Sequence, residues 1–163
     1  MLTELYRKLL LCALAKQDFG SARDIYGAMS EVAKNEPLTR FLMYKIAIRC
    51  DEVEFASECL QMISSFSPKD PTLLYACVLD AQQVGNKPQT LASLQLVLEK
   101  FAYGAPSSIH LPSLLRLTIG LTVTMIDRSK VTEGSSEADE MVGKLCKLFE
   151  GGEKFASFLW KHS

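Results

Sequence analysis

A repeat of thirty-four residues is the feature that most constrains how this chain can fold. Ala22 and Ala56 lie thirty-four residues apart, and apolar residues follow both alanines at helical spacing. The same distance separates Leu9 from Met43. A repeat of this length is one supersecondary unit, which cannot bury its apolar face alone and must stack on its neighbours. The sequence therefore predicts a row of packed helical units.

The length of this repeat is that of a tetratricopeptide repeat, which is two antiparallel helices joined by a tight turn. The pattern predicts an all-α fold, an α–α superhelix built from antiparallel helix pairs. We assign the repeats to residues 3–36, 37–70 and 71–104, and additional helices to residues 107–163. No long linker divides these segments, so we expect a single domain over residues 1–163.

Proline, glycine and short polar runs set the expected helix boundaries. Ala92 lies thirty-six residues after Ala56, which predicts a third repeat whose turn is longer by two residues. Residues 128–137 are polar and are expected to form a mobile loop, and Gly151 and Gly152 are expected to interrupt the last helices. The predicted helices cover residues 3–16, 19–33, 38–50, 53–66, 72–84, 88–101, 112–127, 138–149 and 153–161.

The charge balance gives no reason to expect nucleic acid as a partner. The chain has 18 lysines and arginines against 19 aspartates and glutamates, and no basic cluster stands out. Hydrophobic residues make up 48% of the chain. Two interpretations remain open: a well-filled helical core, or apolar surface intended for a partner or for further repeats.

Three features bear on the compartment. Residues 1–15 resemble a short secretory signal, but Glu4 interrupts their basic region and the segment fits the repeat register. Residues 109–126 are the most apolar stretch, yet His110, Pro112 and Arg116 favour a buried helix over a membrane span. The cysteines show no C-x-x-C pair or metal-like spacing, which favours reduced thiols in an intracellular protein. They are Cys12, Cys50, Cys59, Cys77 and Cys146.

We find no pattern of residues that predicts catalysis. The two histidines, His110 and His162, are the only candidates for a histidine partner of a nucleophile, and neither has a recognisable setting. The chain lacks a G-x-G-x-x-G fingerprint, a phosphate-binding loop and an H-E-x-x-H motif. We therefore predict a protein that is not an enzyme and needs no cofactor or metal.

The expected functional surface is the concave side of the stack, which the first helix of each repeat would line. Lys45 and Arg49 lie four residues apart and share a helix face with Phe41, so an aromatic ring and two cations could receive acidic and apolar side chains together. The alternative interpretation is a solvated helix face. We select Arg7, Phe41, Lys45, Arg49, Tyr75 and Gln82 as partner-binding residues; the wider set of lining positions adds Glu4, Leu11, Leu38, Ile48, Thr72, Leu79 and Gln83.

Three segments between residues 73 and 126 resemble a known family. They are residues 73–82 (LLYACVLDAQ), residues 94–100 (LQLVLEK) and residues 109–119 (IHLPSLLRLTI). The sequences of these segments resemble those of the fungal meiotic scaffolds of the sporulation-twenty-two or zip-four type.

The resemblance implies a non-enzymatic scaffold in the nucleus, on meiotic chromosomes. Such scaffolds recruit other synapsis-initiation proteins and promote crossover formation and assembly of the synaptonemal complex. They are much longer than 163 residues, so the resemblance also implies that this chain is part of a longer scaffold. Two other functions remain open: a peptide-binding tetratricopeptide adaptor of an unrelated intracellular pathway, and a small helical enzyme or ligand carrier.

Overall fold

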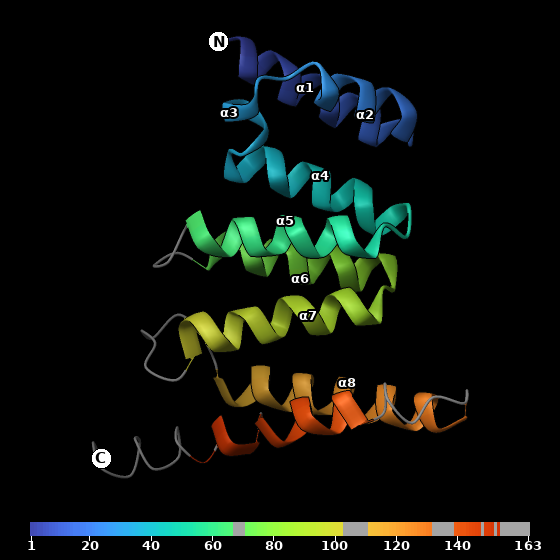
Figure 1. Ribbon diagram of the computed structural model, residues 1–163, viewed down its shortest axis with the longest axis vertical. Coiled ribbons are helices and arrows are strands. Elements are labelled where there is room, and N and C mark those ends of the chain that lie inside the picture. Colours follow the sequence, from blue (N-terminus) through green and yellow to red (C-terminus); the bar gives the residue numbers. More distant parts are fainter. Residues whose placement is uncertain (67–70, 103–110, 132–138, 148, 152, 154–163) are drawn as a thin grey trace. The chain divides into compact units, whose positions relative to one another are not determined.

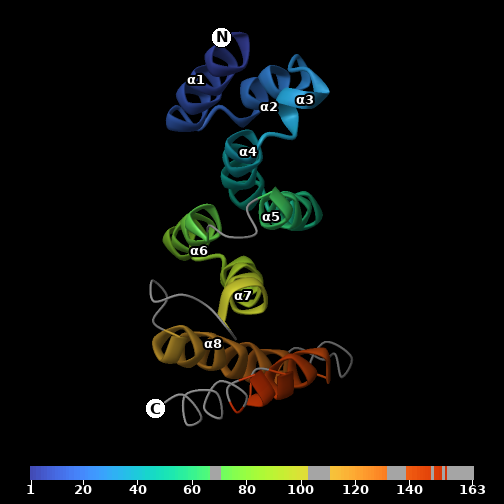
Figure 2. The same cartoon turned by 90° about the vertical axis from the view of Figure 1, so that its left-hand side faces the viewer.

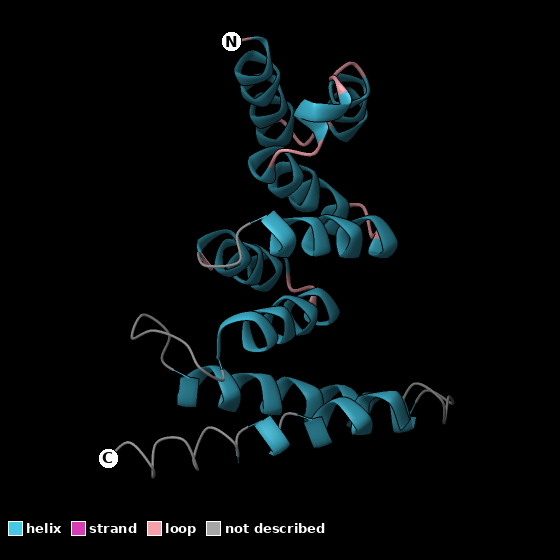
Figure 3. Ribbon diagram, turned by 60° about the vertical axis from the view of Figure 1, so that its left-hand side comes forward, coloured by secondary structure: helices cyan, strands magenta, loops and turns pink. Residues whose placement is uncertain are grey.

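The computed structural model describes residues 1–66, 71–102, 111–131, 139–147, 149–151 and 153. Every regular element in these residues is a helix, and they contain no strand (Figure 3). The prediction of an all-α fold is therefore confirmed. The helices are α1 (Leu2–Ala15), α2 (Phe19–Gly27), α3 (Glu31–Lys34), α4 (Pro37–Arg49), α5 (Val53–Phe66), α6 (Thr72–Val84), α7 (Lys87–Val97), the π-helix η1 (Leu98–Ala102) and α8 (Leu111–Val131).

The helices form two compact units, residues 1–93 and residues 94–163, and α7 contributes to both. In the first unit α1 packs against α2, and α4 packs against α5 (Figure 1). Helix α4 also contacts α1 and α6, so the first helices of successive pairs pack on one another. Within this unit α4 lies between α1 and α6 on one side and α2 and α5 on the other (Figure 2).

The turns between paired helices share one hydrogen-bond pattern at the repeat distance. The amide of Asp18 donates to the carbonyl of Ala13 over 2.9 Å, and the amide of Glu52 donates to the carbonyl of Ala47 over 3.0 Å. The residue before each donor has a left-handed backbone, with φ of 56° at both Gln17 and Asp51. This bond across six residues is the main feature of a Schellman helix end.

The third turn repeats the pattern without any insertion. Asn86 donates its amide to the carbonyl of Ala81 over 2.9 Å, and Gly85 has φ of 77° as expected for a left-handed cap. The next helix starts as its predecessors do, and Thr90 occupies the place of Ala22 and Ala56: each donates its amide to a carbonyl four residues earlier. The predicted slip of two residues is therefore wrong. Ala92 is not the counterpart of Ala56, and the period of thirty-four continues through Thr90.

The second predicted helix, residues 19–33, is divided in the structure into α2 and α3. Helix α2 ends at Gly27, and Ala28 is its C-cap. Ser30 then begins α3 because its extended backbone lets its hydroxyl accept a hydrogen bond from the amide of Ala33. The hydrophobic spacing that predicted one helix did not reveal this local cap.

Helix α4 contributes more buried apolar side chains to the first unit than any other helix. Its residues Met43, Tyr44 and Ile46 are among the largest fully buried side chains, together with Leu10 of α1 and Leu60 of α5. A helix that is covered by α1, α3, α5 and α6 has few positions left for solvent. Those few positions lie on one side of α4.

In the second unit, η1 contacts α8. Thr118, Thr122 and Ile126 of α8 are buried, and Leu117 and Val123 are exposed. The prediction of a buried helix in this stretch is therefore only partly right. The buried hydroxyl of Thr122 donates a hydrogen bond to the backbone carbonyl of Thr118 over 2.8 Å.

The end of the chain differs from the sequence prediction where the structure describes it. Residues 128–131 continue α8 and do not begin a loop, and residues 139–147 and 149–151 are helical. Gly151 itself is helical and is the last residue of the segment 149–151. The rest of the predicted loop (132–137), the first residue of the helix predicted after it (138), Gly152, the tail helix after Glu153, His110 and His162 lie outside the described residues.

Candidate partner-binding face

Helix α4 exposes one narrow stripe and is otherwise buried. From Leu38 to Arg49, the side chains with solvent exposure are Leu38, Phe41, Lys45 and Arg49, at spacings of three, four and four residues. These spacings place them on one side of the helix. Ile48, which the sequence predicted at this surface, is only 2% exposed and belongs to the core. It lies on a side of the helix that another element covers.

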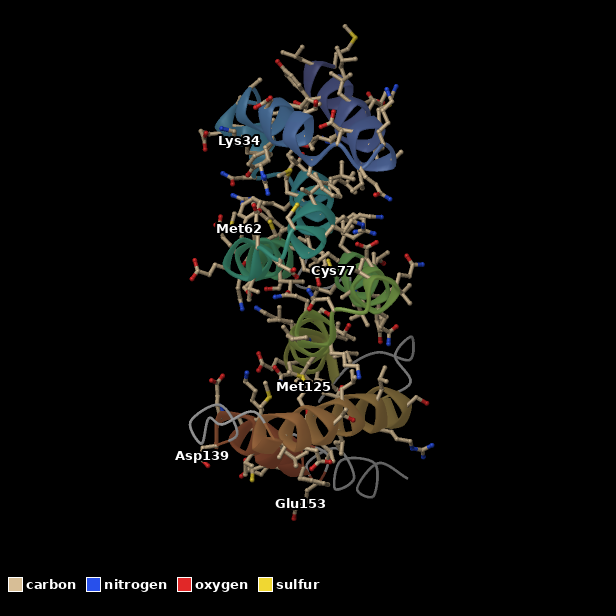
Figure 4. All side chains as sticks on the ribbon, turned by 90° about the vertical axis from the view of Figure 1, so that its right-hand side faces the viewer. Lys34, Met62, Cys77, Met125, Asp139 and Glu153 are labelled. Carbon is tan, nitrogen blue, oxygen red and sulfur yellow. The ribbon has the colours of Figure 1, made fainter. Side chains whose placement is uncertain are left out.

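Helix α6 continues this surface beside α4. Tyr75 is partly exposed, Leu79 is 60% exposed and Gln82 is exposed. Between them, Leu74, Cys77 and Val78 are buried and hold the helix on the core; Cys77 is labelled in Figure 4. We call the exposed side of the first helices the first-helix face. It comprises Arg7, Leu11, Leu38, Phe41, Lys45, Arg49, Tyr75, Leu79 and Gln82.

A buried carboxylate joins the two central helices of this face. The guanidinium of Arg49 donates to both oxygens of Asp80, with Nη1–Oδ2 at 2.7 Å and Nη2–Oδ1 at 3.2 Å. The ammonium of Lys45 lies 3.3 Å from Oδ1 of the same carboxylate. The Asp80 side chain is only 5% exposed, so the bidentate contact with Arg49 is protected from water. The exclusion of water and the two parallel hydrogen bonds both strengthen this contact.

This carboxylate changes how the basic pair is interpreted. Lys45 and Arg49 were predicted as a free patch, but both are bound to Asp80 across α4 and α6. Two cations against one carboxylate leave one positive charge on the face. Lys45 also lies 5.4 Å from the centre of the Phe41 ring, within the range of a cation–π contact. The predicted grouping of Phe41, Lys45 and Arg49 is therefore present, and part of its charge is used inside the fold.

Arg7 of α1 is likewise engaged within the first unit. Its guanidinium pairs with the carboxylate of Glu36, which stands immediately before α4. Arg23 of α2 forms the equivalent link to Glu52, which stands before α5. Both ion pairs join one helix pair to the next. We therefore assign Arg7 a structural role, beside the surface that Phe41 and Tyr75 provide.

The opposite side of α4 holds a buried arginine that the sequence pattern did not single out. Arg40 donates to Glu58 of α5 over 2.9 Å and to the side-chain oxygen of Asn35 over 2.6 Å. Nearby, Lys34 lies over the ring of Tyr26, and that ring packs edge-on against Phe55 (Lys34 is labelled in Figure 4). These contacts hold α2 and α5, the second helices of the first two pairs, against each other and against α4. The sequence signal for Arg40 is a charge that lies away from the helix side shared by Phe41, Lys45 and Arg49.

The two buried thiols, Cys59 and Cys77, are not activated as nucleophiles. Burial raises the pKa of Cys59 to about 11, and burial likewise raises the pKa of Cys77 far above its ordinary range. Both groups are therefore protonated at neutral pH, whereas a nucleophilic cysteine needs a lowered pKa. All five cysteines lie in the described part of the chain as free thiols, and only Cys12 and Cys146 are exposed.

The described residues contain neither a candidate metal site nor a candidate membrane span. Among residues 1–66, 71–102, 111–131 and 139–153 with their gaps, no group of three or more histidine, cysteine, aspartate or glutamate side chains is placed to hold a metal ion. Within the same part of the chain, no helix combines the length and the apolar character that crossing a membrane demands.

No family model, curated protein or solved structure matches the chain. The function is therefore inferred from the geometry of the first-helix face.

Proposed function

We propose that the first unit is a protein-binding scaffold whose first-helix face receives an acidic and apolar segment of a partner protein. The observation that carries the proposal is the exposed stripe of α4. A helix that buries nearly every other side chain leaves Leu38, Phe41 and Lys45 accessible. Exposed apolar side chains next to a cation are typical of surfaces that bind protein partners.

The chemistry of the face favours a particular kind of segment. The rings of Phe41 and Tyr75 and the exposed side chain of Leu79 offer apolar contact. The positive charge that Asp80 leaves uncompensated on Lys45 and Arg49 offers an ionic contact. A partner segment with a carboxylate beside a leucine or an aromatic residue would satisfy both.

The repeated turns support the superhelical interpretation of the chain. The same six-residue hydrogen bond closes three helix pairs at a constant period, and the first helices α1, α4 and α6 pack in succession. Repeat proteins of this kind use the surface of successive first helices to hold other proteins. We therefore propose a tetratricopeptide-like, non-enzymatic scaffold.

The proposed biological setting rests on a separate and narrower observation, the resemblance of residues 73–126 to meiotic scaffolds of the sporulation-twenty-two or zip-four type. On this basis we propose that the partners are synapsis-initiation proteins in the nucleus, on meiotic chromosomes. An adaptor in another intracellular pathway would have the same face and differ only in its partners. The setting and the binding face are thus tested separately.

Affinity capture from meiotic cells tests both parts. The full chain is compared with a Phe41→Ala/Tyr75→Ala variant and with Phe55→Ala, which removes a partly exposed ring from α5 on the other side of the first unit. Proteins that bind the first-helix face should be lost with the double variant and retained with Phe55→Ala. If the same proteins are retained by all three, the face is not the binding surface. If the captured proteins depend on the face but have no role in synapsis, the meiotic setting is wrong and the adaptor is favoured.

A further inference from the structure

The two cations of the first-helix face are held to different degrees. Three hydrogen bonds fix the guanidinium of Arg49: two reach the oxygens of Asp80, and a third runs from Nη1 to the backbone carbonyl of Lys45 over 2.7 Å. In the described part of the chain, the ammonium of Lys45 makes one ionic contact, 3.3 Å from Oδ1 of Asp80. An ammonium group has three N–H donors, so Lys45 keeps donors for a second anion. Moving Arg49 instead would break its bonds to a buried carboxylate.

Lys45 also lies within the apolar part of the face, and Arg49 does not. The ammonium of Lys45 is 5.4 Å from the centre of the Phe41 ring, one turn earlier on α4. On α6, which packs directly against α4, the residue thirty-four positions after Lys45 is Leu79, and it is 60% exposed. The equivalent residue for Arg49 is the polar Gln83. A side chain that pairs with Lys45 therefore brings its neighbours against Phe41 and Leu79.

The charge at this position selects the kind of anion. Lys45 and Arg49 against Asp80 leave one positive charge, which a single carboxylate neutralises. A phosphorylated side chain carries about two negative charges at neutral pH and is normally bound by a cluster of arginines. Here its second charge would have no cation, and it would lie close to the carboxylate of Asp80. The site thus fits aspartate or glutamate better than a phosphorylated residue.

We propose, on the basis of the function proposed above, that Lys45 is the specificity-determining residue of the first-helix face and pairs with one aspartate or glutamate carboxylate of the partner segment. Arg49 is a positioning residue, which holds Asp80 and so keeps α6 beside α4. The two neighbouring cations then have separable effects. Lys45 sets the preference for an acidic residue and adds little to stability, whereas Arg49 adds to stability and leaves the preference to Lys45.

Peptide binding to the full chain tests the proposal. An acidic peptide selected from a random displayed library is synthesised with glutamate, glutamine or phosphoserine at its acidic position, and binding is measured by fluorescence anisotropy. The unaltered chain should bind the glutamate peptide about tenfold more tightly than the glutamine peptide, because a charge-assisted hydrogen bond is lost. The phosphoserine peptide should bind no more tightly than the glutamate peptide.

Three variants separate the roles of the cations. Lys45→Met keeps the aliphatic stem over Phe41, and it should remove the preference for glutamate while the unfolding midpoint stays nearly unchanged. Lys34→Met is the matched control: Lys34 also lies over an aromatic ring, that of Tyr26, but outside the first-helix face, so the preference should remain. Arg49→Lys keeps the charge and loses the bidentate contact, so it should lower the midpoint and retain the preference.

The results that would overturn this proposal differ from those that would overturn the proposed function. A preference for glutamate that survives Lys45→Met, or one that Arg49→Lys removes, would overturn the role of Lys45. Tighter binding of the phosphoserine peptide would overturn the class of anion. In both cases the face remains the binding surface if Phe41→Ala/Tyr75→Ala weakens binding. If no selected acidic peptide depends on Phe41 and Tyr75, the proposed function is wrong and this proposal is wrong with it.

Discussion

Gln17 and Asp51, thirty-four residues apart, end the first helices of two successive pairs with the same left-handed backbone, φ of 56° at both positions. Gly85 occupies the next equivalent position with φ of 77°. The period of the sequence is thus visible in the backbone as well as in the side chains. Two of these positions carry a Cβ in a conformation that disfavours one.

Substitution at these turns should change stability in opposite directions. Gln17→Gly should raise the free energy of unfolding by about 0.5–1 kcal/mol, because glycine adopts positive φ without strain. Gly85→Ala should lower it by about 1 kcal/mol through the same backbone term, since a Cβ at Gly85 meets no atom within 4 Å. Urea denaturation measures both. Equal effects of the same sign would show that φ at these positions does not matter.

The close helix crossing at Ala56 should not tolerate a larger side chain. Ala56 is completely buried, as is Ala22 at the equivalent position of the preceding pair. Ala56→Leu should therefore reduce the free energy of unfolding by about 1–3 kcal/mol through overpacking. Ala15→Leu, at an exposed position of α1, is the control and should leave the unfolding midpoint unchanged. A neutral Ala56→Leu variant would contradict close packing there.

Asp80 should be important for the stability of the first unit. Asp80→Asn leaves Lys45 and Arg49 without their carboxylate at the α4–α6 contact, and we expect a loss of about 1–3 kcal/mol. Glu31→Gln, which breaks the exposed Lys34–Glu31 pair, should leave the midpoint unchanged. In a double-mutant cycle, Arg49→Gln and Asp80→Asn should together cost less than the sum of the single variants. Additive costs would show that the two side chains do not interact.

Asp80 also alters the expected result of charge reversal on the face. From the sequence alone, reversing Lys45 and Arg49 is expected to weaken partner binding and leave thermal unfolding nearly unchanged. In the structure that change would place three carboxylates together at a buried site, so we expect unfolding at a lower temperature. For this reason Phe41 and Tyr75 are the better positions at which to test binding.

The stability of the protein should fall at alkaline pH through Cys59. Burial raises the pKa of Cys59 to about 11 in the folded protein, so the unfolded chain releases this proton at a lower pH than the folded one. Above the ordinary thiol range of pH, the folded state therefore keeps this proton when the unfolded chain has lost it. Because the folded state binds more protons than the unfolded state, the free energy of unfolding decreases towards pH 11. Cys59→Ala should reduce the steepness of this decrease in urea denaturation measured over that range. An unchanged slope would contradict the prediction.

Much of the fold could be predicted because local chemistry determines it. The bounds of α5 and α6 were predicted to the residue, and Gly85 ends α6 as its left-handed C-cap. The division between α2 and α3 was missed because the hydroxyl of Ser30 overrides the hydrophobic spacing. The period was misjudged in the third pair because a small residue, Thr90, replaces the alanine used as a marker.

The face was harder to predict than the helices. The stripe of Phe41, Lys45 and Arg49 follows from spacing alone, but its charge depends on Asp80, thirty-one residues after Arg49. Asp80 is the only charged residue of α6, and it lies among the buried positions Cys77, Val78 and Ala81. A single carboxylate on a buried helix face requires a cation from a neighbouring element. The isolated Asp80 could therefore have identified Lys45 and Arg49 as the cations that pair with it.

Selection of peptides from a random displayed library on the purified full chain tests the proposed binding face most directly. The account predicts enrichment of peptides that combine a carboxylate with a leucine or an aromatic residue. It also predicts that Phe41→Ala/Tyr75→Ala weakens their binding at least about tenfold, the equivalent of about 1.4 kcal/mol, while Phe55→Ala leaves it unchanged. Enriched peptides without acidic residues, or peptides that bind the double variant as tightly as the unaltered chain, would contradict the account.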